Sequence, residues 1–462
     1  MKKHILIATL LFAGAISAAA APAPVPAPLK HAAAKPDPAY GAYLSSEGPL
    51  SVPALHKRPA HTPGKLSDRM HAMTSGNTYT YLRCYYRLSN DLRDPSTDYV
   101  WGLDPSSGGY FHVNGFWYSG SVFAWENMFY SDTSQDALQS ACQYTLAQNG
   151  IQSPVAMVFG ANNDLSFNYT IWTNDSATQG SQINKIVAFG DSLSDNQNMY
   201  NASDWKLPNS SSWYIGHFSN GNVWTEYLAR NLHLPMYDWA LGGAGVNTND
   251  IVIPGLVQQV QSWSQYMQSA PAYNPQNTLF TLLIGGNDLV NYSVPVPQIV
   301  LGVQQALNTL ISRGARNILV LKLPDVSNAP VFQYRTDSAS IAAQVVDYNN
   351  QLAQLVGNLR GQYGASLNLQ LFDTYTVFNA LLTNPSAYGV GNTTQSCLDI
   401  NSTSTFNYTE SHSTRSNCVD PNTFVFWDTL HPTTHTHQIL ANAVTTFVQQ
   451  QFGALPAASL QH

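Results

Sequence analysis

The stretch INKIVAFGDSLSD, residues 183–195, decides the fold class because it joins an apolar strand-like run to a turn that carries a serine. Residues 185–189 have the length and composition of a strand that is buried on both faces. Ser192 follows directly, where its hydroxyl could be presented at the edge of a sheet beside a free backbone N–H. The sequence Gly-Asp-Ser is also common in ordinary turns, so this motif alone leaves both interpretations open.

Further apolar runs and helical patterns follow this stretch. The runs 277–286 and 317–324 are typical of strands, and between and after them the sequence has helical periodicity at 223–232, 255–267, 299–315 and 340–363. Strands that alternate with helices predict a parallel sheet covered by helices on both faces, here spanning residues 183–456. Ligands of such sheets bind beyond the carboxyl ends of the strands.

Two short motifs fall at those strand ends. Gly242-Gly243-Ala244-Gly245 follows the strand-like stretch 236–241, and its small residues allow a phosphate or an oxyanion to approach the backbone. Asn287 follows the run 277–286, where its amide could donate a hydrogen bond to charge that develops on a carbonyl oxygen. Taken alone, the glycine motif is about as compatible with a simple turn, and Gly-Asn-Asp is more often just a turn.

An acid and a histidine stand three residues apart near the C-terminus, at Asp428 and His431. At this spacing the carboxylate can reach Nδ1 of the imidazole and leave Nε2 free as a general base. His435 and His437 follow, so a zinc site is a second interpretation. No carboxylate lies between these histidines and no H-E-x-x-H motif is present, which disfavours a metal site. The alternative places His435 and His437 on the exposed or packed side of the final helix.

The order of these four blocks resembles that of the GDSL or SGNH hydrolase family. The resemblance implies an α/β fold with a flavodoxin-like parallel sheet, acyl transfer through a serine ester, and no metal or cofactor. It assigns catalytic roles to Ser192, Asp428 and His431, and oxyanion-binding roles to Ser192, Gly243 and Asn287. Gln197 departs from the pattern, because many relatives have glycine at that place in the loop after the nucleophile.

The motif FGDSLSD-x-x-N with Tyr200 two residues on is similar to that of the bacterial secreted lipolytic branch of this family. The aromatic region before it resembles that of the thermolabile or lecithin-dependent haemolysins. The resemblance implies a phospholipid or lysophospholipid substrate, with the acyl group passed to water or to an alcohol such as cholesterol. A carbohydrate or short-chain carboxylesterase of the same fold is an alternative. A noncatalytic membrane-binding toxin or adhesin is an alternative of another class.

The charge composition narrows the possible partners. Only 10% of the 462 residues are charged, and 20 basic against 27 acidic residues give a net charge of −7. This composition provides no basic surface for nucleic acid. A weakly charged surface also suits peripheral contact with lipid aggregates.

The first 76 residues differ from the rest of the chain. Lys2 and Lys3 precede an apolar run that ends in small residues near Ala21, which predicts a signal peptide over residues 1–21 and a secreted protein, extracellular or periplasmic. Residues 22–76 are rich in proline and alanine and are interpreted as a leader or linker.

Residues 77–180 are rich in aromatic side chains and are expected to form a small α+β domain, with mainly antiparallel strands. Thr133 followed by Asp136 predicts the start of its one helix, and Gly150 its end. The aromatic side chains are expected to fill the core of this domain, and a surface that contacts substrate or membrane is the alternative.

Four cysteines in an exported protein suggest two disulfides, and three pairings are possible. Cys84–Cys142 and Cys397–Cys418 are predicted, because each pair lies within one domain and closes the shorter loop. The polar loop 397–418 is interpreted either as a lid over the site, opened by a protease at Arg415, or as a tolerated surface insertion.

Overall fold

The computed structural model describes residues 78–118, 126–164, 166–173, 183–248, 253–270 and 272–453. The expected signal peptide and the Pro/Ala-rich leader lie outside these residues. Among the described helices, none has the length and apolar composition needed to cross a membrane.

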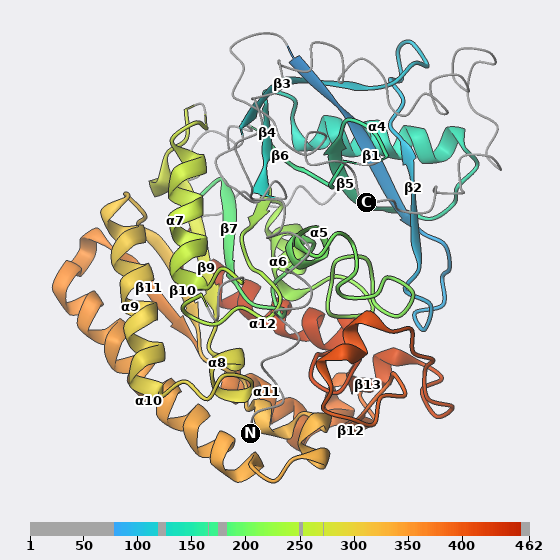
Figure 1. Ribbon diagram of the computed structural model, residues 1–462. Coiled ribbons are helices and arrows are strands. Elements are labelled where there is room, and N and C mark those ends of the chain that lie inside the picture. Colours follow the sequence, from blue (N-terminus) through green and yellow to red (C-terminus); the bar gives the residue numbers. More distant parts are fainter. Residues whose placement is uncertain are drawn as a thin grey trace, which may run out of the picture.

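A five-stranded parallel sheet forms the centre of the second half of the chain (Figure 1). The strand order is β11-β10-β9-β7-β8, so the first strand in sequence lies between the second and the third. This is the flavodoxin-like order, and it confirms the predicted fold class. The strands are β7 (Lys185–Gly190), β8 (Met236–Asp238), β9 (Thr278–Leu283), β10 (Asn317–Leu321) and β11 (Asn368–Phe372).

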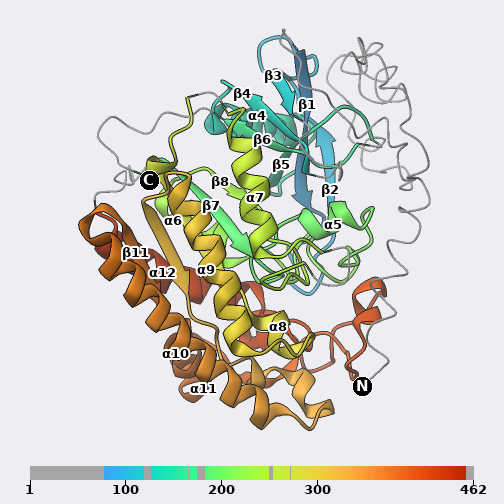
Figure 2. The same cartoon turned by 60° about the vertical axis from the view of Figure 1, so that its left-hand side comes forward.

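Helices cover both faces of this sheet (Figures 1 and 2). One layer holds α7 (Leu256–Met267), α9 (Val296–Ser312) and α10 (Ser338–Tyr363), and the other holds α6 (Trp224–Leu232), α11 (Thr374–Thr383) and α12 (Thr434–Gln451). The inner face of α10 carries Ile341, Val345, Tyr348 and Leu352, whose side chains are all buried. Shorter elements near the carboxyl edge are α5 (Asn198–Ala202), α8 (Gly286–Val290), β12 (Asn392–Ser396) and β13 (Phe424–Phe426).

The N-terminal unit is built on a six-stranded sheet with one helix packed against it. Its strands are β1 (Thr78–Arg87), β2 (Thr97–Trp101), β3 (His112–Tyr118), β4 (Met128–Ser131), β5 (Val155–Ala161) and β6 (Thr170–Thr173). All pairs are antiparallel except β4 with β6.

The helix α4 (Gln135–Gln148) starts one residue later than its sequence pattern suggests. Ser134, rather than Thr133, is the N-cap, and its side chain accepts a hydrogen bond from Ala137 N. Both residues have a side-chain oxygen suited to this position, so the local sequence does not choose between them. Cys142 of this helix is bonded to Cys84 of β1, which is the predicted pairing.

Most aromatic side chains of the N-terminal unit fill its core, as expected. Tyr81, Tyr85 and Trp101 are each no more than 1% exposed. Others join the unit to the α/β sheet. Trp172 stacks on Tyr237 of β8 with ring centroids 3.9 Å apart. The unit is therefore packed directly on the domain that carries the predicted site.

Candidate active site

Ser192 lies in a tight turn at the carboxyl end of β7, an interior strand of the sheet that lies between β9 and β8. Gly190 ends this strand where no side chain would fit, because a Cβ there would lie 2.5 Å from the Leu283 carbonyl oxygen of β9. The turn is closed by bonds from the backbone N–H groups of Ser194 and Asp195 to the Asp191 carbonyl, both at 3.0 Å. Ser192 is held at the sheet edge by backbone geometry and is 7% exposed.

Asp195 joins this turn to the glycine turn that follows β8. Its carboxylate accepts hydrogen bonds from Gly242 N at 2.7 Å and from Met199 N at 2.9 Å. Gly243, which follows Gly242 in the glycine turn, has a φ of +80°, a backbone conformation that residues with a side chain rarely adopt. Within the described part of the chain, the N–H groups of Ser192 and Gly243 donate no hydrogen bond. Both donors are therefore available to a ligand.

Asn287 and Asp288 bring a third turn, after β9, against the glycine turn. Asn287 donates from Nδ2 to the Ala244 carbonyl at 3.1 Å, and its Oδ1 accepts a bond from Asn291 at 2.7 Å. Asp288 accepts from Val246 N with both carboxylate oxygens at 3.1 Å. The bond from Asn291 fixes the orientation of the Asn287 amide, and one N–H of that amide remains for a ligand.

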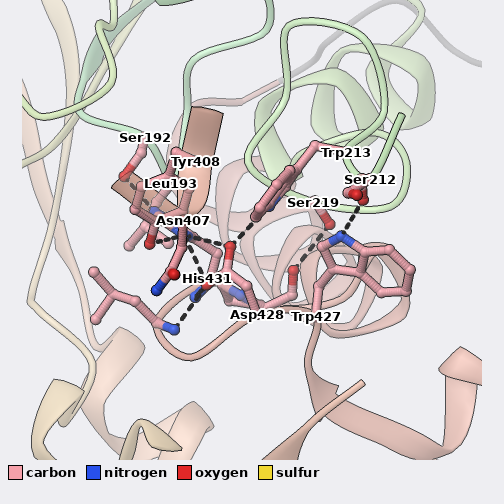
Figure 3. A network of polar contacts seen from close by, with 12 residues as sticks. Ser192, Leu193, Ser212, Trp213, Ser219, Asn407, Tyr408, Trp427, Asp428 and His431 are labelled. Atoms are coloured by element: carbon pink, nitrogen blue, oxygen red, sulfur yellow. Dashed lines mark hydrogen bonds and ion pairs between the residues drawn. The ribbon is translucent and has the colours of Figure 1, made fainter. Parts of the chain in front are cut away.

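His431 and Asp428 complete the arrangement from the loop between β13 and α12 (Figure 3). His431 Nε2 lies 2.8 Å from Ser192 Oγ, and His431 Nδ1 lies 2.9 Å from Asp428 Oδ2. His431 is 3% exposed and Asp428 is fully buried. The structure thus brings a hydroxyl together with an imidazole and a carboxylate that lie far from it in sequence. This arrangement can activate the hydroxyl as a nucleophile.

Trp213, which the sequence analysis did not single out, is a further partner of Asp428. Its indole N–H donates to Asp428 Oδ2 at 2.8 Å, and the backbone N–H groups of Leu430 and His431 donate to Oδ1 at 2.8 Å each. Burial acts to raise the pKa of Asp428. The charge of His431, its side-chain hydrogen bond and the backbone hydrogen bonds from Leu430 and His431 outweigh burial, so the pKa lies below its ordinary value. Asp428 therefore stays ionised beside the imidazole.

Comparisons with known proteins agree with this geometry. Residues 186–444 match the model of the family described as GDSL-like lipase/acylhydrolase. This chain belongs to that family. Residues 53–174 match a second model, described as the N-terminal domain of Vibrio dual lipase/transferase. The chain is therefore an ester hydrolase of the GDSL-like family, with an additional N-terminal unit that has its own relatives.

Individual relatives cover most of the chain. It is 42% identical to the thermolabile hemolysin of Vibrio parahaemolyticus, over 84% of this chain and 92% of the relative. It is 29% identical to the phosphatidylcholine-sterol acyltransferase of Aeromonas hydrophila, over 58% of this chain and 91% of the relative. Among solved structures, a carbohydrate acetylesterase from Sinorhizobium meliloti aligns with 58% of this chain and 99% of its own, at 13% identity and a TM-score of 0.36.

Three buried carboxyl groups surround the three turns of this GDSL-like site. Burial is the largest effect on each of them, and it raises the pKa of Asp191 to about 7 and those of Asp195 and Asp288 to about 6. Asp195 and Asp288 accept backbone hydrogen bonds from the glycine turn, so their function here is to hold that turn in place. The sequence carries no signal for these two contacts, which join residues 42 and 47 positions apart.

Gln197, which departs from the family pattern, is 2% exposed. Within the described residues neither polar atom of its side chain has a hydrogen-bond partner. Its Cα limits the space at Gly216, where a Cβ would lie 2.8 Å away. Gln197 therefore occupies a crowded position in the loop after Ser192.

The loop closed by Cys397–Cys418 packs against the histidine side of the site. Tyr408 Oη lies 3.3 Å from His431 Nδ1, and the Tyr408 backbone carbonyl accepts a bond from Asn209 N at 2.8 Å. Arg415 is engaged as well, since its guanidinium donates to Asp399 Oδ1 at 2.8 Å and to the Ile400 carbonyl at 2.9 Å. Tyr408 thus joins the loop to the rest of the domain, and the Arg415 bonds hold two parts of the loop together.

The other two histidines of the C-terminal cluster lie in the first turns of α12. His435 Nε2 lies 2.9 Å from the Tyr388 carbonyl, and His437 is 2% exposed. Among the described residues, no group of three or more His, Cys, Asp or Glu side chains is arranged to hold a metal ion. The two histidines have the packed positions that the alternative interpretation gave them.

Replacement of Asn287 by alanine is expected to lower kcat for ester hydrolysis by about 10²–10³-fold, the usual cost of one oxyanion donor. The control is Asn291→Ala, which removes only the bond that orients the Asn287 amide and should cost less than the Asn287 change. Initial rates with p-nitrophenyl butyrate measure both. Equal rates for Asn287→Ala and the parent enzyme would contradict the assignment of this amide.

Proposed function

We propose that this chain is a secreted phospholipase A or lysophospholipase that acts through an acyl-enzyme on Ser192 and also transfers the acyl group to a sterol such as cholesterol. The observation that carries the proposal is the chain of contacts from Ser192 Oγ through His431 to Asp428, at 2.8 Å and 2.9 Å. These contacts support a serine nucleophile with its general base and the carboxylate that orients the base.

The first half of the reaction forms the acyl-enzyme. Ser192 Oγ attacks the ester carbonyl while its proton passes to His431 Nε2. The negative charge on the former carbonyl oxygen is stabilised by the N–H groups of Ser192 and Gly243 and by the Asn287 amide. As the tetrahedral intermediate collapses, His431 returns the proton to the leaving alcohol, and the acyl group remains on Ser192.

The second half releases the acyl group. A water molecule gives its proton to His431 and attacks the acyl carbon, so that the products are a fatty acid and free Ser192. A sterol hydroxyl in place of water gives a sterol ester by the same steps. The ionised Asp428 stabilises the imidazolium in both halves.

Three observations support the lipid substrate and the secreted location. Relatives named as a hemolysin and as a phosphatidylcholine-sterol acyltransferase align over most of their length. The N-terminal unit matches a domain named for a dual lipase/transferase. The apolar run before Ala21 has the composition of a signal peptide.

The proposal is tested by acyl release from phosphatidylcholine, lysophosphatidylcholine and acetylated xylan, each with and without cholesterol in the lipid phase. We expect release from the two phospholipids, and cholesteryl ester when cholesterol is present. Release from the acetylated sugar alone would favour the carbohydrate esterase instead. If the protein hydrolyses none of these substrates and still causes haemolysis, a noncatalytic membrane-binding toxin would be favoured.

Within this proposal, the Cys397–Cys418 loop controls entry to the site and is the target of an activating protease. Its support is the contact between Tyr408 of the loop and His431. Arg415 is the one lysine or arginine in residues 397–418, so trypsin has a single cleavage site there. The bonds of its guanidinium must open before a protease can bind it.

Cleavage after Arg415 is expected to change the rate of phosphatidylcholine hydrolysis at least threefold, because it frees the segment that packs on His431. The measurement compares rates before and after limited trypsin treatment, with cleavage followed by mass spectrometry. Arg415→Gln lacks the cleavage site and serves as the matched control. A cleaved loop with an unchanged rate would show that the loop is a tolerated insertion.

A further inference from the structure

The segment 214–222, between α5 and α6, packs on the loop that carries His431. The Ser219 hydroxyl donates to the carbonyl of Pro432, the residue after His431, at 2.9 Å (Figure 3). The ring of Phe218 lies 5.0 Å from the imidazole of His431, measured between ring centroids. The position of this imidazole therefore depends on how the segment 214–222 is held.

Asn220 joins this segment to two other parts of the molecule with one fully buried amide. Its Oδ1 accepts a hydrogen bond from Thr434 N at 2.9 Å, three residues after His431. Its Nδ2 donates to the Leu92 carbonyl at 3.1 Å. Leu92 belongs to the turn 88–96 between β1 and β2, so the amide connects the N-terminal unit to the segment that follows the histidine.

The bond to Thr434 meets a need of helix α12, of which Thr434 is the first residue. The backbone N–H groups in the first turn of a helix have no partner within the helix. The N-cap Thr433 accepts from Thr436 N, and Asn220 supplies the acceptor for Thr434 N. The start of α12 is therefore fixed by a side chain that is itself bonded to the N-terminal unit.

Arg87, the last residue of β1, makes a second link between the two parts. Its Nη1 donates to the Asn220 carbonyl at 2.9 Å, and its Nη2 donates to the Asp94 carbonyl in the turn 88–96 at 3.0 Å. Its Cζ also lies 5.2 Å from the centroid of the Tyr214 ring, at the start of the segment 214–222. One guanidinium thus holds the turn 88–96 and Asn220 in a fixed relation.

We infer that Arg87 and Asn220 are positioning residues, through which the N-terminal unit holds His431 at the distance from Ser192 that proton transfer requires. The inference rests on the proposed function, because it takes His431 as the general base. The two residues act through Thr434 and Pro432, which lie in the same loop as the histidine or directly after it. A small displacement of this loop would lengthen the 2.8 Å contact between His431 Nε2 and Ser192 Oγ.

The test replaces Arg87 by methionine, which removes both guanidinium bonds and keeps an unbranched side chain. Arg93→Met is the matched control, because the Arg93 guanidinium bonds to Asp91 within the same turn. We expect Arg87→Met to lower kcat for p-nitrophenyl butyrate about tenfold and to leave KM within about twofold of the parent value, since a displaced base slows the chemical steps and leaves the substrate contacts in place. The control should change neither value.

A smaller folded fraction would also lower the apparent kcat. Rates are therefore expressed per mole of Ser192 that a fluorophosphonate probe labels at completion, and thermal unfolding checks each variant. Asn220→Asp keeps the test valid if Arg87→Met does not fold. Its carboxylate can still accept from Thr434 N but cannot donate to the Leu92 carbonyl, so it should give the same loss in kcat without a change in KM.

Three results would overturn the inference. The first is a kcat within about twofold of the parent value in the folded variants, and the second is an equal loss in Arg93→Met. The third is a raised KM with an unchanged kcat, which would mean that the N-terminal unit acts on substrate binding instead. Failure of the proposed function differs from all three, because the parent enzyme would then hydrolyse p-nitrophenyl butyrate without releasing acyl groups from phospholipids, or would hydrolyse neither.

Discussion

Replacement of Ser192 by alanine is expected to reduce ester hydrolysis by about 10⁴–10⁶-fold and to leave the protein folded. The hydroxyl is the group that bonds to His431 Nε2, at 2.8 Å, and its removal eliminates the nucleophile. The turn itself depends on bonds to the Asp191 carbonyl and on the Asp195 carboxylate, neither of which involves Ser192 Oγ. The loss is therefore chemical and not structural.

Initial rates with p-nitrophenyl butyrate and phosphatidylcholine measure this loss, and near-ultraviolet circular dichroism checks the fold. Ser211→Ala, at an exposed serine, is the matched control and should keep the parent rate. A fluorophosphonate probe should label the parent enzyme at Ser192 and leave the variant unlabelled. Activity within tenfold of the parent in the Ser192 variant would remove the acyl-enzyme mechanism.

The sheet could be predicted from sequence where burial makes strands apolar. β7 and β9 are buried at every position, so their composition marks them as central parallel strands. The edge strand β11 was not predicted, because it is only partly buried and carries Asn368 and Gln370 in its five residues. A short strand of this kind lacks the apolar run on which the prediction relied.

The candidate site divides in the same way. Ser192, Gly243 and Asn287 lie in short motifs after strands of the parallel sheet, and parallel strands bring such motifs to one edge. Asp428 and His431 follow β13, which pairs only with β12 among the described strands, so their place beside Ser192 was implied by the family resemblance alone.

Trp213 and Tyr408 have no such marker. Trp213 is 215 residues from the Asp428 that it contacts, and Tyr408 lies in an irregular polar loop. Only the tertiary structure reveals that these two side chains pack around the histidine–aspartate pair.

Replacement of Asp428 by asparagine is expected to lower kcat/KM by about 10⁴-fold, the second largest effect expected for this site. The carboxylate accepts four hydrogen bonds, two of them from His431, and an amide has a single oxygen to accept them. In the variant the amide N–H₂ either faces another hydrogen-bond donor or donates to His431 Nδ1. In the second case the proton of the imidazole lies on Nε2, which is the wrong tautomer for a general base. His431 then no longer presents a free Nε2 lone pair to Ser192.

Trp213→Phe is the matched control for this prediction, since it removes one donor to Asp428 and leaves the carboxylate in place. This variant should lower kcat/KM roughly tenfold, which corresponds to about 1.4 kcal/mol of transition-state stabilisation.

Both variants are assayed between pH 5 and pH 9 with p-nitrophenyl butyrate, and thermal unfolding confirms that each is folded. Because the pKa of Asp428 lies below its ordinary value, its ionisation contributes no change in rate across this range in the parent enzyme. A loss of less than tenfold in a folded Asp428→Asn protein would show that His431 acts without the carboxylate, and Trp213 would then have no role in catalysis.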